Sequence, residues 1–380
     1  MFSIGQPLIF ISDIYSLDGF WNKCNIIIII TAIYFILVLG ITVFIHELGH
    51  FLFAKKAGIY VYEFSIGMGP KLFQIHSKKD ETVYSIRLFP IGGYVQMAGE
   101  SVEEDKNIPK EKMMQSKTWL QRFMTIIAGV LFNFLLAILL FFVIGLINGS
   151  PSRETFINTV EIDSPAYNAG LLENSKIVSL NGHKIKSLSH LALELEINYG
   201  ENFDFTVVTP SGDEKTVSIK PIEKHDNVDE NNDSGKKYYY GFSYKNNYEK
   251  GLFAAIKYAF TNVLALIHQM ILVIFYLITG KLSLNNLSGP IGIYNIVGEA
   301  AKYGILTMMN LIGLLCVNVG FINILPLPAF DGGRLLFLVI EKIKGKSVDP
   351  KIENTIHLVG MVLLMILMVV ITYNDILRFF

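Results

Sequence analysis

Five apolar stretches, each about 20 residues or longer, constrain this sequence more than any other feature. A helix needs about 20 mainly apolar residues to cross a bilayer. Of the 380 residues, 52% are hydrophobic and only 17% are charged, which excludes an ordinary soluble protein. The sequence therefore predicts a polytopic α-helical membrane protein. The stretches cover residues 25–45, 123–148, 258–280, 303–330 and 354–374.

The charges are balanced overall but unevenly placed along the chain. Lys and Arg total 32 and Asp and Glu total 33, so the net charge of −1 gives no field that would attract nucleic acid. The expected partner is the lipid bilayer. Basic residues are dense between Lys55 and Arg122, and again between Arg334 and Lys351. Because Lys and Arg near the ends of membrane helices stay inside the cell, both segments are predicted to be cytoplasmic.

These two assignments limit how many of the apolar stretches can cross. The second stretch must lead outward, residues 151–250 must form an external domain, and the fourth stretch must return. The third stretch therefore cannot cross as a simple span, and we expect a membrane-associated helix there. The predicted architecture is four transmembrane helices plus this membrane-associated helix. It divides into an N-terminal membrane region (1–150), the external domain (151–250), a membrane-associated region (251–302) and a C-terminal membrane region (303–380).

The end of the first stretch reads His46-Glu47-Leu48-Gly49-His50, the HExxH pattern. Residues four apart share one face of a helix, so His46 and His50 can bind the same zinc ion. Glu47 can then act as the catalytic base, taking a proton from zinc-bound water and passing it to the leaving amine. The alternative is a set of interfacial polar residues without function. Ionisable side chains in a membrane helix are costly and usually functional, which favours a zinc metalloprotease.

A catalytic zinc needs a third protein ligand, and Asp331 is the best candidate. It follows the fourth stretch at its predicted cytoplasmic end, the side on which His50 is also expected. Pro326 and Pro328 break the helix before it, and irregular backbone at membrane depth is tolerated only where it is buried in protein or lines a cavity. An ordinary helix terminus is the plainer interpretation. The lone carboxylate beside the prolines favours a metal site.

Together these motifs resemble the site-2 protease family of intramembrane zinc metalloproteases, over nearly the whole chain. The resemblance implies zinc held by His46, His50 and Asp331 with Glu47 as the base, in agreement with the interpretation above. Besides HExxH, four further segments carry it: residues 64–72, 90–95, 288–293 and 323–334.

The family also implies residues that contact the substrate. Asn323 is expected near the substrate or the developing oxyanion, and Pro326 and Pro328 belong to the same run. Asn133 resembles an element of the family's second span that usually has Pro where Val130 stands here. The shape of the helix at that point is therefore left open.

Residues 83–97 alternate around Pro90 and the pair Gly92-Gly93, a pattern typical of a turn between strands. In the family a similar segment forms a membrane-dipping β-hairpin near the active site. The resemblance therefore implies that Gly92 and Gly93 bind the substrate and that an unwound substrate strand can pair with the hairpin edge. A plain cytoplasmic hairpin is the alternative.

Residues 164–171 and 176–182 of the external region resemble a PDZ domain. Asn181-Gly182 predicts a hairpin turn, and residues 188–195 predict a helix after a Ser cap. PDZ domains bind extended chain ends by adding a strand to a sheet edge. We expect one PDZ-like α+β domain, which either filters substrates or forms a passive cap.

The resemblance implies a function in regulated intramembrane proteolysis. The expected substrates are transmembrane segments of single-pass membrane proteins, of the anti-sigma factor or signal-peptide type. The enzyme is expected to be a monomer in the bacterial inner (cytoplasmic) membrane, with the PDZ-like domain on the periplasmic side. The alternative from another class is a noncatalytic membrane scaffold that binds chain ends. His190 and His357 lack partners at ligand spacing and are expected to be structural or solvated. His268 interrupts an apolar stretch and is expected to lie at an interface without a functional role.

Overall fold

The computed structural model describes residues 17–78, 80–100, 108–224, 237–283, 287–346 and 348–379. The chain forms two compact units, each described by itself below. The first unit comprises Met1–Phe132, Leu287–Ile312 and Ile324–Phe380, and the second comprises Asn133–Asn286 and Gly313–Asn323.

Five of the described helices are long and apolar enough to cross a membrane, which identifies a multi-pass membrane protein. They correspond to the five predicted stretches, but the fourth helix is shorter than its stretch because it ends at Ile324, before Pro326 and Pro328. Large apolar side chains such as Ile27, 60% exposed, point outward from these helices and suit contact with lipid. The five helices are α1 (Leu17–Lys56), α2 (Trp119–Asn148), α5 (Leu252–Ile278), α7 (Ile305–Ile324) and α9 (Pro350–Phe379).

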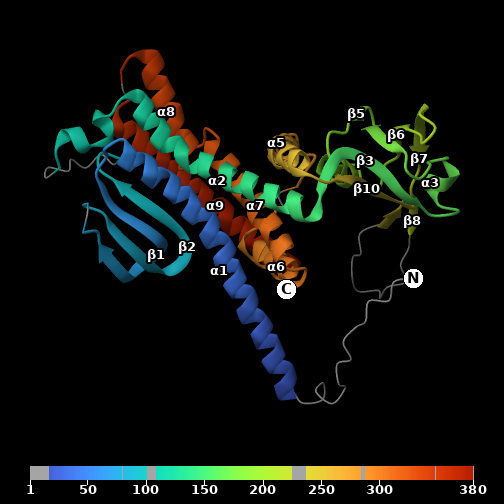
Figure 1. The fold of residues 1–380 in the computed structure, drawn as a ribbon, viewed down its shortest axis with the longest axis horizontal. Helices are drawn as coiled ribbons and strands as arrows, with labels where there is room; N and C mark the ends of the chain where they lie inside the picture. The colour runs from blue at the N-terminus through green and yellow to red at the C-terminus, as the bar shows by residue number, and fades with distance from the viewer. Residues whose placement is uncertain are drawn as a thin grey trace. The chain divides into compact units, whose positions relative to one another are not determined.

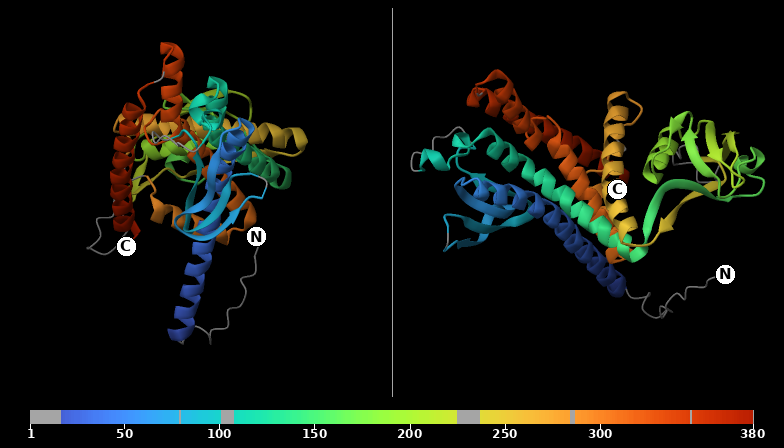
Figure 2. Two further views of the ribbon diagram at one scale, coloured as in Figure 1. Left: turned by 90° about the vertical axis from the view of Figure 1, so that its left-hand side faces the viewer. Right: turned by 45° about the horizontal axis from the view of Figure 1, so that its top comes forward.

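In the first unit, two long strands form a sheet beside the second half of α1 (Figures 1 and 2). The strands are β1 (Val61–His76) and β2 (Val83–Met97). Residues 63–66 of β1 pair with 83–86 on one side and with 93–96 on the other. The chain therefore turns back within β2, in the region of Pro90 and Gly92 where the sequence predicts a turn.

The rest of the first unit holds α8 (Asp331–Lys344) against the start of α2. Trp119 Nε1 donates a hydrogen bond of 2.9 Å to the carbonyl of Leu338, and Arg122 forms two bonds of 2.8 Å with the carboxylate of Glu341. These contacts fix the orientation of α8, and hence of its first residue. The unit also contains the short 3-10 helices η2 (Lys110–Lys112) and η3 (Met114–Ser116), and α6 (Pro290–Lys302).

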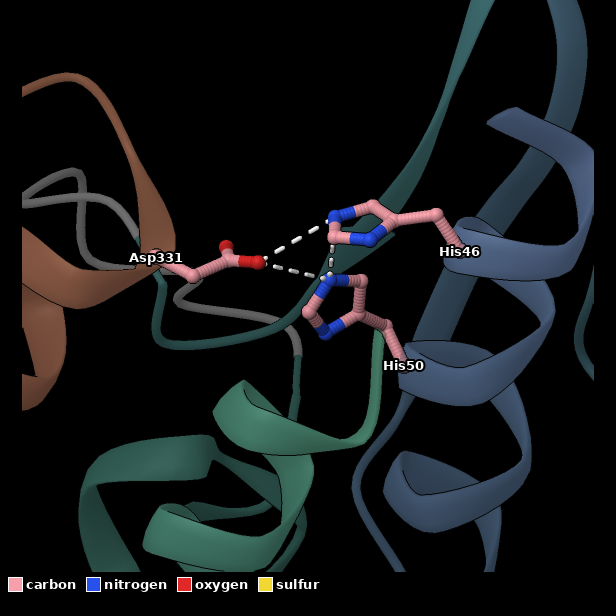
Figure 3. Close-up of side chains that lie close together, drawn as sticks. All are labelled: His46, His50 and Asp331. Atoms are coloured by element: carbon pink, nitrogen blue, oxygen red, sulfur yellow. Dashed lines mark hydrogen bonds and ion pairs between the residues drawn. The ribbon is translucent and has the colours of Figure 1, made fainter. Parts of the chain in front are cut away.

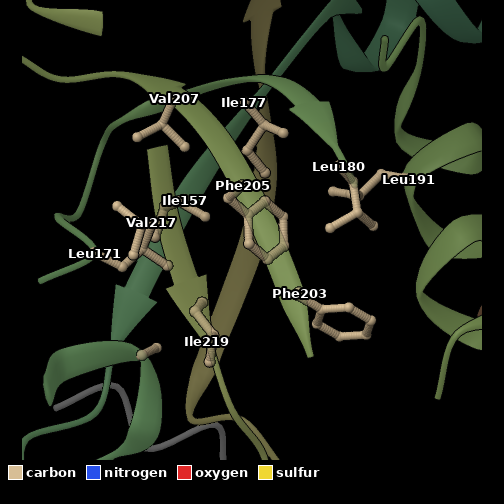
Figure 4. Close-up of a cluster of buried hydrophobic side chains, with 11 residues drawn as sticks. Ile157, Leu171, Ile177, Leu180, Leu191, Phe203, Phe205, Val207, Val217 and Ile219 are labelled. Atoms are coloured by element: carbon tan, nitrogen blue, oxygen red, sulfur yellow. The ribbon is translucent and has the colours of Figure 1, made fainter. Parts of the chain in front are cut away.

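The second unit contains a six-stranded sheet with the described order β10-β3-β4-β6-β7, and β5 paired with β4. One face of the sheet and the helix α4 enclose a core that includes Phe205, Leu180 and Leu191, all fully buried (Figure 4). The elements are β3 (Ser150–Val160), α3 (Pro165–Asn168), β4 (Lys176–Leu180), β5 (His183–Lys184), α4 (Leu188–Ile197), β6 (Phe203–Val208), β7 (Glu214–Ile219) and β10 (Phe242–Glu249), with a separate pair β8 (Ile222–Lys224) and β9 (Lys237–Tyr239).

Two local predictions in this unit are confirmed. Asn181 and Gly182 connect β4 to β5 and have φ values of 50° and 81°. Both central positions of such a tight turn require positive φ, which Asn and Gly adopt readily. Ser187 caps α4: its side chain accepts a hydrogen bond of 3.1 Å from the backbone N–H of His190. Local sequence chemistry is therefore sufficient to place both elements.

Candidate metal centre

The HExxH residues lie in the last turns of α1, as the sequence predicts. Both imidazoles point to the same side of the helix, since four residues advance the chain by just over one turn. His46 and His50 are each 7% exposed. Their Nε2 atoms are 3.2 Å apart. Two buried nitrogen atoms thus face one point.

Asp331 reaches this point from a separate part of the chain (Figure 3). It is the first residue of α8, after an irregular segment in which Ala329 has a φ of 75°. The following Gly332 allows the segment to fold tightly, because a Cβ atom there would lie 2.1 Å from the carbonyl oxygen of Leu325. The predicted break at Pro326 and Pro328 therefore serves to bring a carboxylate to the two histidines.

The three side chains form an equilateral arrangement of possible ligand atoms. Asp331 Oδ2 lies 3.2 Å from Nε2 of His46 and 3.2 Å from Nε2 of His50, so all three edges are equal. A tetrahedral zinc site with bonds of about 2.0 Å has ligand–ligand edges of about 3.3 Å. Among the described residues, this is the one group of three or more His, Cys, Asp or Glu side chains placed to hold a metal. These residues, called the metal centre below, fit zinc.

Electrostatics at the metal centre also favours a cation. Burial alone would raise the pKa of Asp331, but His50 and His46, which face it, lower that pKa below its ordinary value, so the side chain is a carboxylate. His50 Nδ1 lies 2.9 Å from the carbonyl oxygen of Thr125 and can only donate to it. With Nδ1 donating to Thr125, Nε2 is the nitrogen that can bind a metal ion beside the carboxylate.

Two glycines, Gly129 of α2 and Gly49 of α1, make room for the histidines. A Cβ atom at Gly129 would lie 2.3 Å from Nε2 of His50 and 2.7 Å from Cε1 of His46. Gly49 on α1 has the same role for the backbone, since its Cβ would lie 2.4 Å from the carbonyl oxygen of Ala128. The metal centre therefore depends on a close approach of α1 and α2 that only glycine permits.

Glu47 lies beside the sheet of the first unit. A Cβ atom at Gly93 would be 3.4 Å from Cγ of Glu47 and 2.7 Å from the carbonyl oxygen of Ser65. Gly92 follows the turn of β2 with a φ of 88°, against the side chain of Met68. Two of the predicted substrate-binding residues, Gly92 and Gly93, thus lie in the strand next to the predicted base.

The remaining predicted site residues are placed as follows. Pro326 and Pro328 lie in the segment before Asp331, in the first unit. Asn133 is fully buried in α2 and Asn323 is near the end of α7, and both belong to the second unit. The sequence left open the shape of the second span at Val130, where the family usually has Pro. In the structure α2 is one continuous helix through Val130.

Sequence reasoning missed the residues that support the ligands. Thr125 orients His50 through its backbone carbonyl. Every residue has a backbone carbonyl, so the residue type at position 125 could not indicate this role. His357 of α9 was expected to be merely structural; its Nδ1 accepts a hydrogen bond of 3.0 Å from the backbone N–H of Ala329, two residues before Asp331. Gly129 precedes Asn133 in the run that resembles the family's second-span element. This resemblance was the only sequence feature that could have indicated a role for Gly129.

Comparisons with known proteins identify the family of this chain. The sequence pattern of peptidase family M50 matches residues 34–367. The chain is 33% identical to the zinc metalloprotease RasP of Geobacillus kaustophilus, over 92% of this chain and 98% of the relative. It is 34% identical to the regulator of sigma-W protease RasP of Bacillus subtilis, over 92% and 99%. A zinc metalloprotease RasP of Oceanobacillus iheyensis is 31% identical over 92% and 99%. The matched range covers most of the chain, and the chain belongs to peptidase family M50, the site-2 protease family.

Proposed function

We propose that this membrane metalloprotease is an intramembrane zinc metalloendopeptidase that cleaves transmembrane segments of single-pass membrane proteins. One observation carries the proposal: three possible ligand atoms, from His46, His50 and Asp331, lie 3.2 Å from one another on helices of a multi-pass membrane protein. The similarity to proteins named zinc metalloprotease supports the same metal.

His46, His50 and Asp331 would hold the zinc, which when bound supplies an acidified water and polarises the scissile carbonyl. Glu47, on the same helix as both histidines, would act as the general base, accepting a proton from the attacking water and passing it to the leaving amine. The carbonyl of Thr125 keeps His50 in the tautomer that leaves Nε2 available. The two histidines and the base come from adjacent turns of α1, whereas Asp331 comes from α8 and the Thr125 carbonyl from α2.

A helical substrate hides its peptide bonds, so it must be extended before cleavage. The segment of β2 from 93 to 97 pairs with β1 on one side, and no described strand pairs with its other edge. Because Gly93 lies next to Glu47, a substrate strand added at this edge would pass the base. We assign Gly92 and Gly93 to substrate binding on this basis, and Pro326, Pro328, Asn133 and Asn323 on the family resemblance alone.

The sheet of the first unit is suited to dip into the membrane. Its outer residues are large, apolar and exposed, which would be unfavourable in water but favourable in lipid. They include Met68 (52% exposed), Leu72 (63%), Phe73 (58%), Ile75 (55%) and Phe89 (56%).

Contacts within the second unit support four crossings with α5 as a membrane-associated helix. Near its start, the ring of Tyr258 packs edge-on against Phe141 in the second half of α2, 6.2 Å between centroids. Near its end, Tyr276 donates a hydrogen bond of 2.8 Å to Glu194 of the sheet-containing domain. Contacts with the outer half of α2 at one end and with the proposed external domain at the other favour a helix that stays on one side of the bilayer. Cysteines placed at Lys250 and Lys281 should therefore react with a membrane-impermeant reagent from the same side, whereas labelling from opposite sides would contradict this topology.

The sheet-containing domain is proposed to be PDZ-like and to lie on the extracytoplasmic, periplasmic side of the bacterial inner (cytoplasmic) membrane. Its described edge strand β10 is paired only with β3, which leaves an edge for an extended chain end. The name of the Bacillus subtilis relative, regulator of sigma-W protease, favours anti-sigma factors as substrates. Signal-peptide remnants are the second substrate class, and the protein is proposed to act as a monomer.

The direct test is Glu47→Gln in the purified full-length protein. Loss of a general base should reduce cleavage of a reporter transmembrane peptide by about 10²–10⁴-fold while zinc remains bound, because Glu47 is not a ligand. Glu299→Gln is a matched control, since Glu299 on α6 is largely exposed and pairs only with Lys302 among the described residues. Cleavage by the Glu47→Gln variant at the parental rate would rule out this assignment, and a scaffold that only binds chain ends would show no cleavage in either protein.

A further inference from the structure

A second group of histidines joins two elements of the second unit, α4 of the sheet-containing domain and α5. Its centre is Glu194, whose side chain is only 2% exposed. Glu194 Oε1 accepts a hydrogen bond of 2.8 Å from Tyr276 of α5 and lies 3.4 Å from Nε2 of His190. A buried carboxylate thus connects the two helices.

Lys186, just before α4, contacts one histidine through its backbone and another through its side chain. Its backbone N–H donates a hydrogen bond of 3.3 Å to Nδ1 of His190, and its ammonium lies 3.1 Å from Nε2 of His268 on α5. An ammonium can only donate, so Nε2 of His268 must be the acceptor. The two imidazole rings lie edge to face with centroids 5.3 Å apart. These contacts define the α4–α5 cluster: Lys186, His190, Glu194, His268 and Tyr276.

Both imidazoles must be neutral to make these contacts. A protonated imidazole has no lone pair, so protonation of His190 would break its bond from the Lys186 backbone, and protonation of His268 would break its bond from the Lys186 ammonium. It would also place two imidazolium ions next to an ammonium, with Glu194 as the one carboxylate in the cluster.

The other titratable groups around the cluster lie beyond Glu194 and do not replace these contacts. Nδ1 of His183, which is 57% exposed, is 3.4 Å from Oε2 of Glu194. The ammonium of Lys281 lies 5.8 Å from the centre of the Tyr276 ring. Each would add positive charge, and neither offers an acceptor to Lys186.

We propose that the α4–α5 cluster is an acid-sensitive contact: protonation of His190 and His268 releases α4, and with it the sheet-containing domain, from α5. The inference rests on contacts within the second unit and does not depend on the proposed proteolysis. In the proposed topology this domain meets the medium outside the cytoplasm, whose pH would then set how firmly the domain is attached.

The direction of the effect follows from the contacts. Burial lowers the pKa of His190, as do the charges of His268 and Lys186, and the charge of Glu194 only partly opposes them. The released form therefore binds protons more readily than the attached form, so attachment is complete above the ordinary histidine pKa of about 6.5 and weakens as the pH falls below it. Between pH 7.5 and 5.5 the attachment constant should fall by about tenfold for each histidine.

Hydrogen exchange of the full-length protein in lipid nanodiscs tests the proposal. After correction for the intrinsic pH dependence of exchange, residues 188–197 of α4 and 268–278 of α5 should exchange at least about tenfold faster at pH 5.5 than at pH 7.5. Strands β6 and β7 should keep their protection at both pH values, which shows that the domain remains folded. Unchanged protection of α4 and α5 in the parental protein would overturn the proposal.

The matched variant is His190→Gln combined with His268→Gln, because a Gln carbonyl can accept from Lys186 but cannot be protonated. Its α4 and α5 should show the same protection at both pH values. The same pH-dependent loss as in the parental protein would assign the effect to other groups and overturn the proposal. If the double variant is unprotected even at pH 7.5, Lys186→Ala decides: it removes the nearby ammonium and should make the pH effect smaller, and an undiminished effect would count against the proposal.

Discussion

The metal centre and the α4–α5 cluster both contain two histidines near one carboxylate, yet they are suited to different chemistry. In the metal centre, two Nε2 atoms and one oxygen converge with equal edges of 3.2 Å. In the α4–α5 cluster, the lone pairs of His190 and His268 are directed at hydrogen-bond donors of Lys186 instead. Three ligand atoms that converge on one point can share a metal ion, whereas separate donors satisfy each ring without one.

Packing explains why one site is fixed and the other can open. The metal centre lies where α1 and α2 approach through Gly49 and Gly129, with no space for a side chain. Close-packed interiors resist displacement. The α4–α5 cluster is held by polar contacts that include an exposed Lys–His pair, and such contacts are readily exchanged for water. The same residue types are therefore ligands in one setting and titrating contacts in the other.

The largest expected effect separates the two sites by their metal content. His46→Ala, His50→Ala and Asp331→Ala should each reduce bound zinc in the purified protein from about one ion per chain to less than about a tenth, because two remaining ligands cannot hold the metal tightly. His190→Ala should leave the zinc content unchanged. Elemental analysis of the full-length protein measures both. Loss of zinc from His190→Ala, with zinc retained in His46→Ala, would show that the α4–α5 cluster and not the metal centre binds zinc.

A second prediction tests the close packing around the metal centre. Gly129→Ala places a methyl group 2.3 Å from Nε2 of His50, so at least one ring must move and zinc affinity should fall by about tenfold to a hundredfold. Gly40→Ala is the control, since the same methyl group on α1 would meet no atom within 4 Å. A zinc titration with a competing chelator compares them. Equal affinities in the two variants would show that the approach of the helices is looser than described.

How far the sequence predicts the site depends on whether a residue acts by its own chemistry or through packing. The HExxH histidines and Asp331 could be found because the residue types themselves indicate the chemistry. Two imidazoles at helical spacing, and a carboxylate after a broken span, are typical metal ligands. Thr125 acts through a backbone carbonyl, and no sequence pattern reports that. Gly129 matters only because another helix lies against it.

The fold shows the same division. Helix lengths, the turn at Asn181-Gly182 and the Ser187 cap follow from local rules. The contact of His268 with Lys186 joins residues 82 positions apart, and single-residue reasoning expects such a histidine to be structural. Long-range polar contacts depend on how helices pack, which composition and periodicity do not specify.

A third prediction contrasts the α4–α5 cluster with a carboxylate of the first unit that should be insensitive to mild acid. Burial alone would raise the pKa of Glu63, but hydrogen bonds from Ser85, Arg87 and Lys71 lower it to about 2. Arg87 Nη2 donates to Glu63 at 2.8 Å, and Lys71 Nζ lies 3.1 Å away. Because the folded-state pKa is below the unfolded value of about 4.3, this stabilisation is complete above pH 4.3 and is lost as the pH falls toward 2.

Hydrogen exchange of β2 should therefore be the same at pH 7.5 and 5.5 after intrinsic correction, under conditions in which α4 and α5 lose protection. Glu63→Gln should speed exchange of β2 about tenfold to a hundredfold at pH 7.5, since hydrogen bonds to a charged group contribute about 1.5–3 kcal/mol. Glu111→Gln, on the exposed helix η2, is the control. Faster exchange of β2 at pH 5.5 than at pH 7.5 would contradict the prediction that only the α4–α5 cluster responds to mild acid.

The smallest expected effect concerns His357, which makes the same kind of bond as His190 but next to a metal ligand. Each Nδ1 accepts a backbone N–H, from Ala329 in one case and Lys186 in the other. His357→Ala removes a hydrogen bond that contributes about 1 kcal/mol, so zinc affinity should fall only about fivefold. His357→Asn, whose side-chain carbonyl is a possible acceptor, should restore part of the loss. If His357→Ala abolished zinc binding altogether, the segment before Asp331 would depend on this single bond, and the prolines and Gly332 would not be sufficient to hold it.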